Sequence, residues 1–419
     1  MIKIISLIIF LIGYVAISQE HILKISKTAI SLLLGVSLWM LVIVGGQNNV
    51  DHALVESGAE IFGLVIFLLS AMTLVEILTH YGLFDVIYTK LVYMRLKDKA
   101  QFVILSFLTF IFSAFLDNLT TTIVFLQIAG RFFRGQNLLR ASAAIVIAAN
   151  AGGAFSPIGD VTTTMLWLAG KFTTPTVITQ GILPSLTVFV VSMLFLSKRI
   201  TADTKDVVER PIRIGKIEWL VISLCLFSFV LPLVMTTLHF PPYIGLLLGL
   251  GTVWFVVDVI KHRLPQRTSL MISIEKFFQK TDISSLYFFI GILLSISALR
   301  HIGLLDDISK TIFSSAKTEH IIAGNVLIGS LSAVFDNIPL TAAAIDIVKT
   351  TDQRLWVLLA FTVGVGGSIL SIGSAPGIIA MSMVRELTFA RYLKIATIPA
   401  IVAYVLGVLV WFLQFSLHT

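Results

Sequence analysis

Long apolar stretches, separated by short polar segments, dominate the chain. Runs that approach membrane-spanning length occur near residues 2–18, 28–46, 61–79, 141–170, 176–197, 217–238, 243–260, 284–300, 355–384 and 395–415. A helix needs roughly 20 such residues to cross the hydrocarbon layer of a bilayer. Because that layer offers no water to backbone polar groups, these runs are predicted to be helices. The pattern therefore predicts an all-α polytopic membrane protein.

Composition strengthens this prediction. Of 419 residues, 57% are hydrophobic and 13% are charged, whereas an average soluble domain carries roughly 25% charged residues. These values exclude a soluble enzyme, a nucleic-acid-binding protein and a disordered chain. The net charge of +7 then fits basic residues in cytoplasmic loops. The lipid bilayer is the predicted partner, no nucleic-acid partner is expected, and a homodimer is left open.

Three short motifs occur twice, in the same order. The first copies are His80-Tyr-Gly-Leu-Phe-Asp85, Ser113-Ala-Phe-Leu-Asp117-Asn118 and Gly152-Gly-Ala-Phe-Ser-Pro-Ile-Gly159. The second copies are His301-Ile-Gly-Leu-Leu-Asp306, Ser332-Ala-Val-Phe-Asp336-Asn337 and Gly366-Gly-Ser-Ile-Leu-Ser-Ile-Gly373. Their nearly constant offset predicts a duplicated fold. We expect a first repeat over 1–197, a basic cytoplasmic linker over 198–216 and a second repeat over 217–419.

Two further apolar segments, 101–130 and 319–350, are interrupted by Asp-Asn pairs. Basic residues flank the first segment on both sides: Arg95, Lys97 and Lys99 before it, and Arg131, Arg134 and Arg140 after it. The positive-inside rule then places both of its ends in the cytoplasm, which predicts a re-entrant hairpin. The second segment is predicted to be its counterpart.

Counting crossings gives about five per half plus one hairpin, provided that 2–18 is a retained helix. The alternative for 2–18 is a signal peptide, because Lys3 precedes an apolar core that ends in Ala16-Ile-Ser18. An odd number of crossings inverts the second half relative to the first. The expected fold class is therefore two inverted-topology repeats, as in secondary transporters.

Asp117 and Asp336 are the strongest candidates for chemistry. Each lies where one short helix is expected to end and another to begin, so its side chain can cap the second helix. Carbonyl groups left unpaired by the first helix, together with Asn118 and Asn337, would complete a hard-oxygen site for a small alkali cation. The structural alternative is that these aspartates only cap buried helices. An Asn or a Ser would do that without burying a charge.

Gly- and Pro-rich segments interrupt the runs 141–170 and 355–384 and predict two discontinuous helices. Asp160 is expected to cap the second part of one broken helix, and Ser374 lies at the equivalent point of the other. Asn150, Ser156, Thr162 and Thr163 add neutral oxygens. A mere packing kink explains the glycines but not Asp160.

Weaker candidates for a proton path lie elsewhere in the chain. Glu76 and His80 share a helix face at i, i+4 spacing, although solvation at a helix end explains them equally well. Asp346 lies in the second arm of the second hairpin, opposite Gln127 of the first.

The chain resembles the NhaD-type sodium/proton antiporter family of the ion-transporter superfamily. The resemblance covers nearly the whole sequence and is carried most specifically by Asn150-Ala-Gly-Gly-Ala-Phe-Ser-Pro-Ile-Gly-Asp160-Val-Thr-Thr-Thr-Met-Leu-Trp167 and the two Asp-Asn pairs. It implies a transporter rather than an enzyme, without a cofactor, that exchanges sodium or lithium for protons in a bacterial inner membrane or a plastid envelope. The ion site that it implies comprises Ser113, Asp117, Asn118, Asn150, Asp160, Thr162, Thr163, Ser332, Asp336, Asn337, Ser371 and Ser374.

The sign of the predicted charges agrees with this expectation. Three carboxylates at membrane depth, from Asp117, Asp160 and Asp336, favour a cation and supply proton acceptors. A sodium-coupled carboxylate symporter or an arsenite permease of the same superfamily remains the alternative. An intramembrane aspartyl protease is a more distant one, because the segment before Asp160 reads Pro-Ile-Gly and lacks a Gly-x-Gly-Asp pattern.

Overall fold

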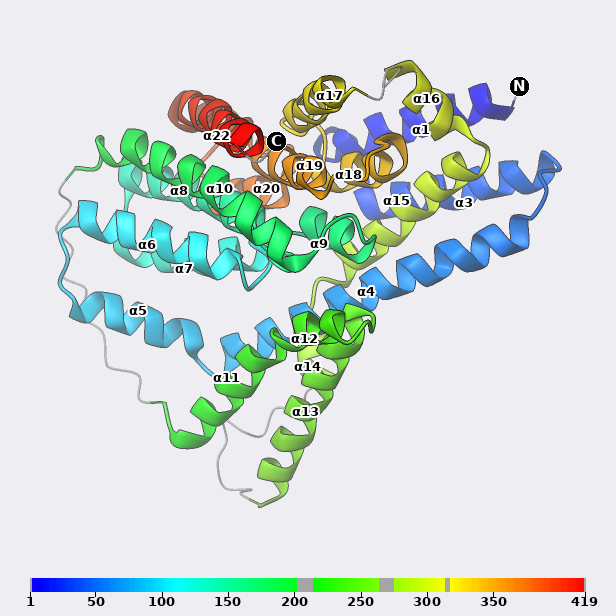
Figure 1. Ribbon diagram of the computed structural model, residues 1–419. Coiled ribbons are helices and arrows are strands. Elements are labelled where there is room, and N and C mark those ends of the chain that lie inside the picture. The colour runs from blue at the N-terminus through cyan, green and yellow to red at the C-terminus, as the bar shows by residue number, and fades with distance from the viewer. Residues whose placement is uncertain (1, 202–213, 264–274, 313–316, 418–419) are drawn as a thin grey trace.

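A computed structural model describes residues 2–201, 214–263, 275–312 and 317–417 (Figure 1). In these ranges all regular elements are helices. Most of the linker predicted over 198–216, namely 202–213, lies outside the described residues.

The first half of the chain contains α1 (Ile2–Ser18), α2 (Glu20–Leu23), α3 (Lys27–Val44), α4 (Val50–His80), α5 (Leu83–Tyr93), α6 (Asp98–Ser113), α7 (Asn118–Phe132), α8 (Gly135–Gly153), α9 (Val161–Leu168) and α10 (Thr174–Ser197). The second half contains α11 (Lys216–Ser228), α12 (Leu231–Thr237), α13 (Pro242–Arg263), α14 (Glu275–Lys280), α15 (Ile283–His301), α16 (Leu304–Ile312), α17 (Thr318–Leu331), α18 (Asn337–Ile347), α19 (Gln353–Gly366), α20 (Ala375–Met383), α21 (Phe389–Tyr392) and α22 (Ile398–Leu417). A π-helical turn, Leu393–Thr397, joins the last two.

Seven helical segments among the described residues are long and apolar enough to cross a bilayer. They are Lys27–Val44, Val50–His80, Thr174–Ser197, Lys216–Thr237, Pro242–Lys261, Ile283–His301 and Phe389–Leu417. The protein is therefore a multi-pass membrane protein. Two shorter apolar helices, α18 and α19, lie between the last two of these segments in the chain.

Two details differ from the predicted pattern. The run expected at 217–238 is divided into α11 and α12, because Pro232 lies in the first turn of α12 and cannot continue a preceding helix. The short helices α5 and α16 were not expected as separate elements. Each follows a glycine of the repeated His-x-Gly-Leu-x-Asp motif, Gly82 at φ +83° and Gly303 at φ +68°. This left-handed conformation favours glycine and lets the chain turn sharply after a long helix.

The interior is formed by α8 and α19, which lie between the outer helices (Figure 1). Nearly every residue from Ala141 to Gly153 is fully buried, as is nearly every residue of α19. A helix that is apolar and small-residue-rich on all sides is suited to such a position. Around this core α3 packs against α15, and α10 packs against α22, so each pair joins the two halves of the chain.

Glycine contacts hold the α6–α7 and α17–α18 helix pairs against the central breaks. A side chain on Gly159 would overlap the carbonyl oxygen of Ser113, and one on Gly373 would overlap that of Ser332. These two contacts join equivalent positions of the sequence repeat. Close backbone approach of this kind requires glycine and positions Asp117 and Asp336 beside the broken helices.

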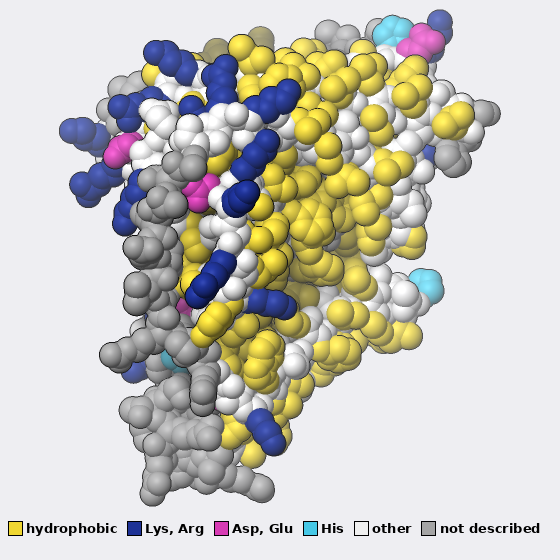
Figure 2. Space-filling view, turned by 90° about the vertical axis from the view of Figure 1, so that its left-hand side faces the viewer, with side chains coloured by type: hydrophobic (Ala, Val, Ile, Leu, Met, Phe, Trp, Pro, Cys, Tyr) yellow, Lys and Arg dark blue, Asp and Glu magenta, His cyan; other side chains and the backbone are white. Residues whose placement is uncertain are grey.

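Basic residues gather on one face of the molecule (Figure 2). It is the left-hand side of Figure 1, where α5 ends and α6 begins and where α8 begins near the end of α10. The exposed basic residues of these connections are Arg95, Lys97, Lys99, Arg131, Arg134, Lys198 and Arg199. Both ends of the α6–α7 helix pair carry basic residues, as the sequence predicts.

Candidate functional site

Asp117 is the residue before α7 and caps that helix. Its carboxylate accepts hydrogen bonds from the Thr120 backbone N–H at 2.8 Å and from the Thr120 hydroxyl at 2.6 Å. This is the predicted N-cap geometry, with the side chain half-buried. Among the described residues no basic side chain forms an ion pair with Asp117.

Asp336 has the equivalent position before α18, but its surroundings differ. One carboxylate oxygen accepts a hydrogen bond from the Ile338 backbone N–H at 3.1 Å. The other oxygen lies 3.5 Å from the Lys27 ammonium group, at the first residue of α3. The Lys27 ammonium also lies 4.5 Å from the centroid of the Phe288 ring. Sequence reasoning missed Lys27, because nothing in the local pattern places the start of α3 beside the start of α18.

Asp160, whose residue is 3% exposed, joins the first helix pair to the first broken helix. Its carboxylate accepts hydrogen bonds from the Asn118 amide at 2.9 Å and from the Thr162 hydroxyl at 2.6 Å. It occupies the N-cap position of α9, as predicted, but makes no capping hydrogen bond to the backbone. The Asp160 side chain therefore joins the Asn118 amide to the first turn of its own helix.

Asn150 joins the two halves of the chain. Its side-chain oxygen accepts a hydrogen bond from Asn118, and its amide donates to the Ser368 and Ser374 hydroxyls at 2.8 and 3.0 Å. These partners lie 218 and 224 residues further along the chain. The two helix breaks, one from each half, thus share one buried hydrogen-bond network.

Two predicted serines make equivalent contacts in the two halves. Ser113 donates to the carbonyl oxygen of Ala149 at 2.6 Å, and Ser332 donates to that of Val363 at 2.7 Å. Ser332 also bonds to the Asn337 side-chain oxygen. Both serines anchor a helix pair to a central helix.

A cavity of about 60 Å³ lies between these elements. Its lining includes all three predicted carboxylates, both predicted tip asparagines and one ammonium group: Asp117, Asp160, Asp336, Asn118, Asn337 and Lys27. Helices from both halves contribute to it. The structure therefore brings together the central residues that the sequence predicts.

Other predicted residues lie outside this cavity. The hydroxyl of Thr163 is buried and has no hydrogen-bond partner among the described residues. Ser371 is buried at φ +64° with its hydroxyl 3.5 Å from the Met381 sulfur. Ser156 lies in the bend between α8 and α9. His80 lies beside the Phe277 ring. Neither His80 nor Glu76 lines the cavity of the three carboxylates or the larger cavity described next.

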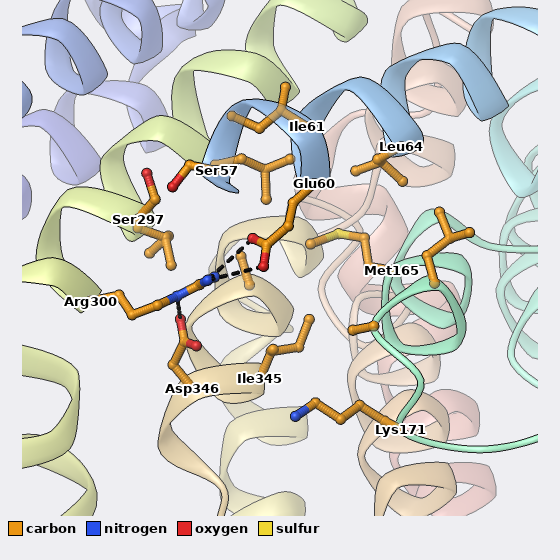
Figure 3. A pocket seen from close by; sticks show the side chains of 15 residues that line it. Ser57, Glu60, Ile61, Leu64, Met165, Lys171, Ser297, Arg300, Ile345 and Asp346 are labelled. Carbon is orange, nitrogen blue, oxygen red and sulfur yellow. Dashed lines mark hydrogen bonds and ion pairs between the residues drawn. The ribbon is translucent and has the colours of Figure 1, made fainter. Parts of the chain in front are cut away.

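A second, larger cavity of about 460 Å³ contains Asp346 (Figure 3). Arg300 of α15 points between Asp346 of α18, at 2.9 Å, and Glu60 of α4, at 3.2 Å. Lys171 lines the same cavity with its ammonium 4.7 Å from the Trp356 ring centroid. Two carboxylates therefore face two cations here. Glu60, Arg300 and Lys171 were missed from the sequence, because each is a single charge near the end of an apolar run.

Spanning helices from two halves of one chain, arranged around a buried polar cluster at helix breaks, define a membrane transporter rather than an enzyme. Comparison with known proteins makes this class specific. The family model described as "Citrate transporter" (CitMHS) matches residues 8–364. The relatives named "Sodium/proton antiporter 2" and "Sodium/proton antiporter 1" of Arabidopsis thaliana are 36% and 35% identical, covering 93% and 98% of this chain and 94% and 72% of their own lengths.

"Na(+)/H(+) antiporter NhaD" of Vibrio cholerae is 29% identical over 93% of this chain and 87% of its own length. "Na(+)/H(+) antiporter NhaD" of Vibrio parahaemolyticus is 31% identical over 83% of this chain and 89% of its own length. The chain accordingly belongs to the NhaD-type sodium/proton antiporter family, and most of it also matches the CitMHS family model.

Proposed function

We propose that the protein exchanges sodium or lithium ions for protons at the cavity formed by Asp117, Asp160 and Asp336. The observation that carries this proposal is the charge of the cavity lining. Three carboxylates face a space of about 60 Å³, and the described lining residues include one basic group. The names of the relatives support the same exchange.

The ligand chemistry favours a small, hard cation. Carboxylate oxygens, asparagine oxygens and carbonyl groups at helix ends are typical ligands of such ions. A carboxylate that holds a proton cannot also bind sodium tightly, so the two ions exclude each other. Competition at one site is sufficient for exchange when the site faces the two sides of the membrane in turn.

The proposed architecture is a pair of inverted repeats. The recurrence of the serine and glycine contacts at equivalent positions supports the duplication. The helices α6 and α7 have 16 and 15 residues, or about 22–24 Å at 1.5 Å per residue, which is less than the roughly 30 Å of the hydrocarbon layer. Their basic ends support a re-entrant hairpin that opens to the cytoplasm. We place the protein in a bacterial inner membrane.

A carboxylate symporter is the second candidate, because the matching family model is described as a citrate transporter. The cavity of the three aspartates is far smaller than the roughly 300–1,000 Å³ of typical small-molecule pockets, and its carboxylates would repel an anion. The larger cavity has sufficient volume, but its Arg300 already pairs with two carboxylates. The cation is therefore the better-supported substrate.

The deciding experiment uses inside-out membrane vesicles acidified by respiration and a pH-sensitive dye. Addition of sodium or lithium should raise the internal pH, whereas potassium and labelled citrate serve as comparison substrates. Asp117→Asn and Asp160→Asn should abolish the response. Asp306→Asn is the matched control, because this aspartate is exposed and pairs with Lys349 away from the cavity. Absence of any sodium- or lithium-evoked alkalinisation by the wild-type protein, from acid to alkaline pH, would reject the proposal.

A further inference from the structure

The two hairpin aspartates differ in their ionic partners, although their positions in the repeat are equivalent. Asp117 and Asp336 each cap the second helix of their pair. Asp336 lies 3.5 Å from the Lys27 ammonium, whereas no described residue forms an ion pair with Asp117. The sequence repeat alone therefore does not describe the charge of the site.

Several contacts hold Lys27 at this place. Its side chain is 24% exposed and that of Asp336 is 20% exposed, so water screens the pair only in part. The Phe288 ring lies under the ammonium group and adds a cation–π contact. Ser26 caps α3, and the Lys27 backbone N–H donates to the Glu20 carboxylate, so the start of the helix is also fixed.

The corresponding helix of the second half has no lysine at its start. In element order, the helix equivalent to α3 is α13, which begins Pro242-Tyr-Ile-Gly-Leu246 and has no basic residue before Lys261. The helix α13 packs against α4 as α3 packs against α15. The asymmetry is therefore present in the sequence itself and is not a matter of one side-chain conformation.

From these observations we infer that Lys27 is a fixed internal counter-ion of Asp336, and that the transported cation binds at Asp117 and Asp160. The inference rests on the proposed exchange of cations at this cavity and assigns unequal roles to its three carboxylates. With Lys27 in place, two negative charges remain for the cation. Asp336 then acts as a positioning residue that keeps the ammonium away from the two other carboxylates.

The test is a double-mutant cycle of sodium-evoked exchange in vesicles. Asp336→Asn should lose exchange, because it leaves an unpaired ammonium in a cation site. Lys27→Gln combined with Asp336→Asn should recover exchange, since the two charges are removed together. Interaction energies between contacting side chains correspond to roughly 2- to 150-fold in an equilibrium constant. We therefore expect the double variant to recover exchange at least several-fold over Asp336→Asn.

The matched control combines Lys27→Gln with Asp117→Asn. This double variant should stay inactive, because the lost carboxylate binds the cation directly. If the Lys27→Gln, Asp336→Asn double variant is inserted and folded but remains as inactive as Asp336→Asn, then Asp336 itself contacts the cation and the inference is wrong. Equal recovery of both double variants would also overturn it.

A second measurement separates this inference from the proposed function. If the wild-type protein shows no exchange, the proposed sodium/proton exchange is rejected, but the pairing of Lys27 with Asp336 is not yet tested. The thermal unfolding temperatures of the same variants in detergent still test the pairing. Lys27→Gln and Asp336→Asn should each unfold at a lower temperature than the wild type, and the variant that combines them should recover part of the loss. Lys27→Arg keeps the positive charge and should preserve the wild-type temperature. Strictly additive losses would reject the counter-ion.

Discussion

Removal of the Asn150 side chain should separate the two halves of the central network. Asn150 is fully buried in α8 and takes part in three side-chain hydrogen bonds, one to Asn118 and two to serines of the second half. A buried neutral hydrogen bond contributes about 0.5–1.5 kcal/mol net. Asn150→Ala should therefore lower the free energy of unfolding by about 3 kcal/mol, about 1 kcal/mol for each lost hydrogen bond. No further cost is expected at Asn118, because its amide keeps the hydrogen bond to Asp160.

Asn325→Ala is the matched control. Asn325 is also fully buried, in α17, but its amide makes one hydrogen bond, to the Leu355 carbonyl at 2.7 Å, and its oxygen has no partner among the described residues. Both substitutions remove the same atoms, so the costs of the resulting cavities largely cancel. The expected loss from the control's hydrogen bond is about 1 kcal/mol, which leaves about 2 kcal/mol to the network that joins the halves.

Tryptophan fluorescence in mixed micelles, titrated with a denaturing detergent, measures both values, and vesicle assays measure exchange. Asn150→Ala should also abolish exchange, because it removes the side chain that links Asn118 to Ser374 across the two helix breaks. Asn325→Ala should retain exchange. Equal destabilisation by the two variants, together with full exchange by Asn150→Ala, would refute the reasoning that this network couples the two halves.

Three further predictions, two of them with a comparison variant, test separate features of the fold. Thr163→Val should leave stability unchanged or raise it by about 1 kcal/mol, since it replaces a buried hydroxyl that has no partner among the described residues by a methyl group; the micelle titration measures this. In the same titration Arg300→Gln should lower the free energy of unfolding by about 1.5–3 kcal/mol, because it leaves the largely buried Asp346 carboxylate without its ionic partner. Glu60→Gln removes the more exposed carboxylate that pairs with Arg300 and should lower it by only about 0–1 kcal/mol. Gly373→Ala should prevent accumulation of folded protein on size-exclusion chromatography, since its side chain would overlap the carbonyl oxygen of Ser332, whereas Gly130→Ala meets open space and should be tolerated.

Local signals account for the parts of the fold that the sequence predicts well. The apolar runs predict the long helices because the length of a run is a property of one segment. The helix starts at Asn118 and Asn337 follow from the preceding aspartates, whose side chains cap them. The helices α5 and α16 were missed because 11 and 9 residues are too few to register as a membrane span. The repeated glycine before each does mark the turn.

Contacts between distant segments account for what the sequence does not reveal. The Asp-Asn pairs and the Asn150–Asp160 segment identify the members of the site, because glycine, proline and aspartate at membrane depth are unusual. They do not reveal which members touch. Lys27 belongs to the start of a spanning helix, where a lone lysine is ordinarily an interfacial anchor. The packing of α3 against α15, together with that of α15 against α18, brings it to Asp336.

The position of Asp346 on its helix follows from the sequence, whereas its ionic partner does not. Ile338, Ala342 and Asp346 follow one another at four-residue spacing on α18, so they share a face. Ile338 lines the carboxylate cavity, whereas Ala342 and Asp346 line the larger one. On α15, likewise, Phe289 lines the carboxylate cavity and Leu293, four residues further on, lines the larger one. The two cavities therefore lie about one helical turn, or roughly 5 Å, apart along both helices. Periodicity predicts that Asp346 lies on the same face as the site, but its pairing with Arg300 depends on how α15 and α18 pack together.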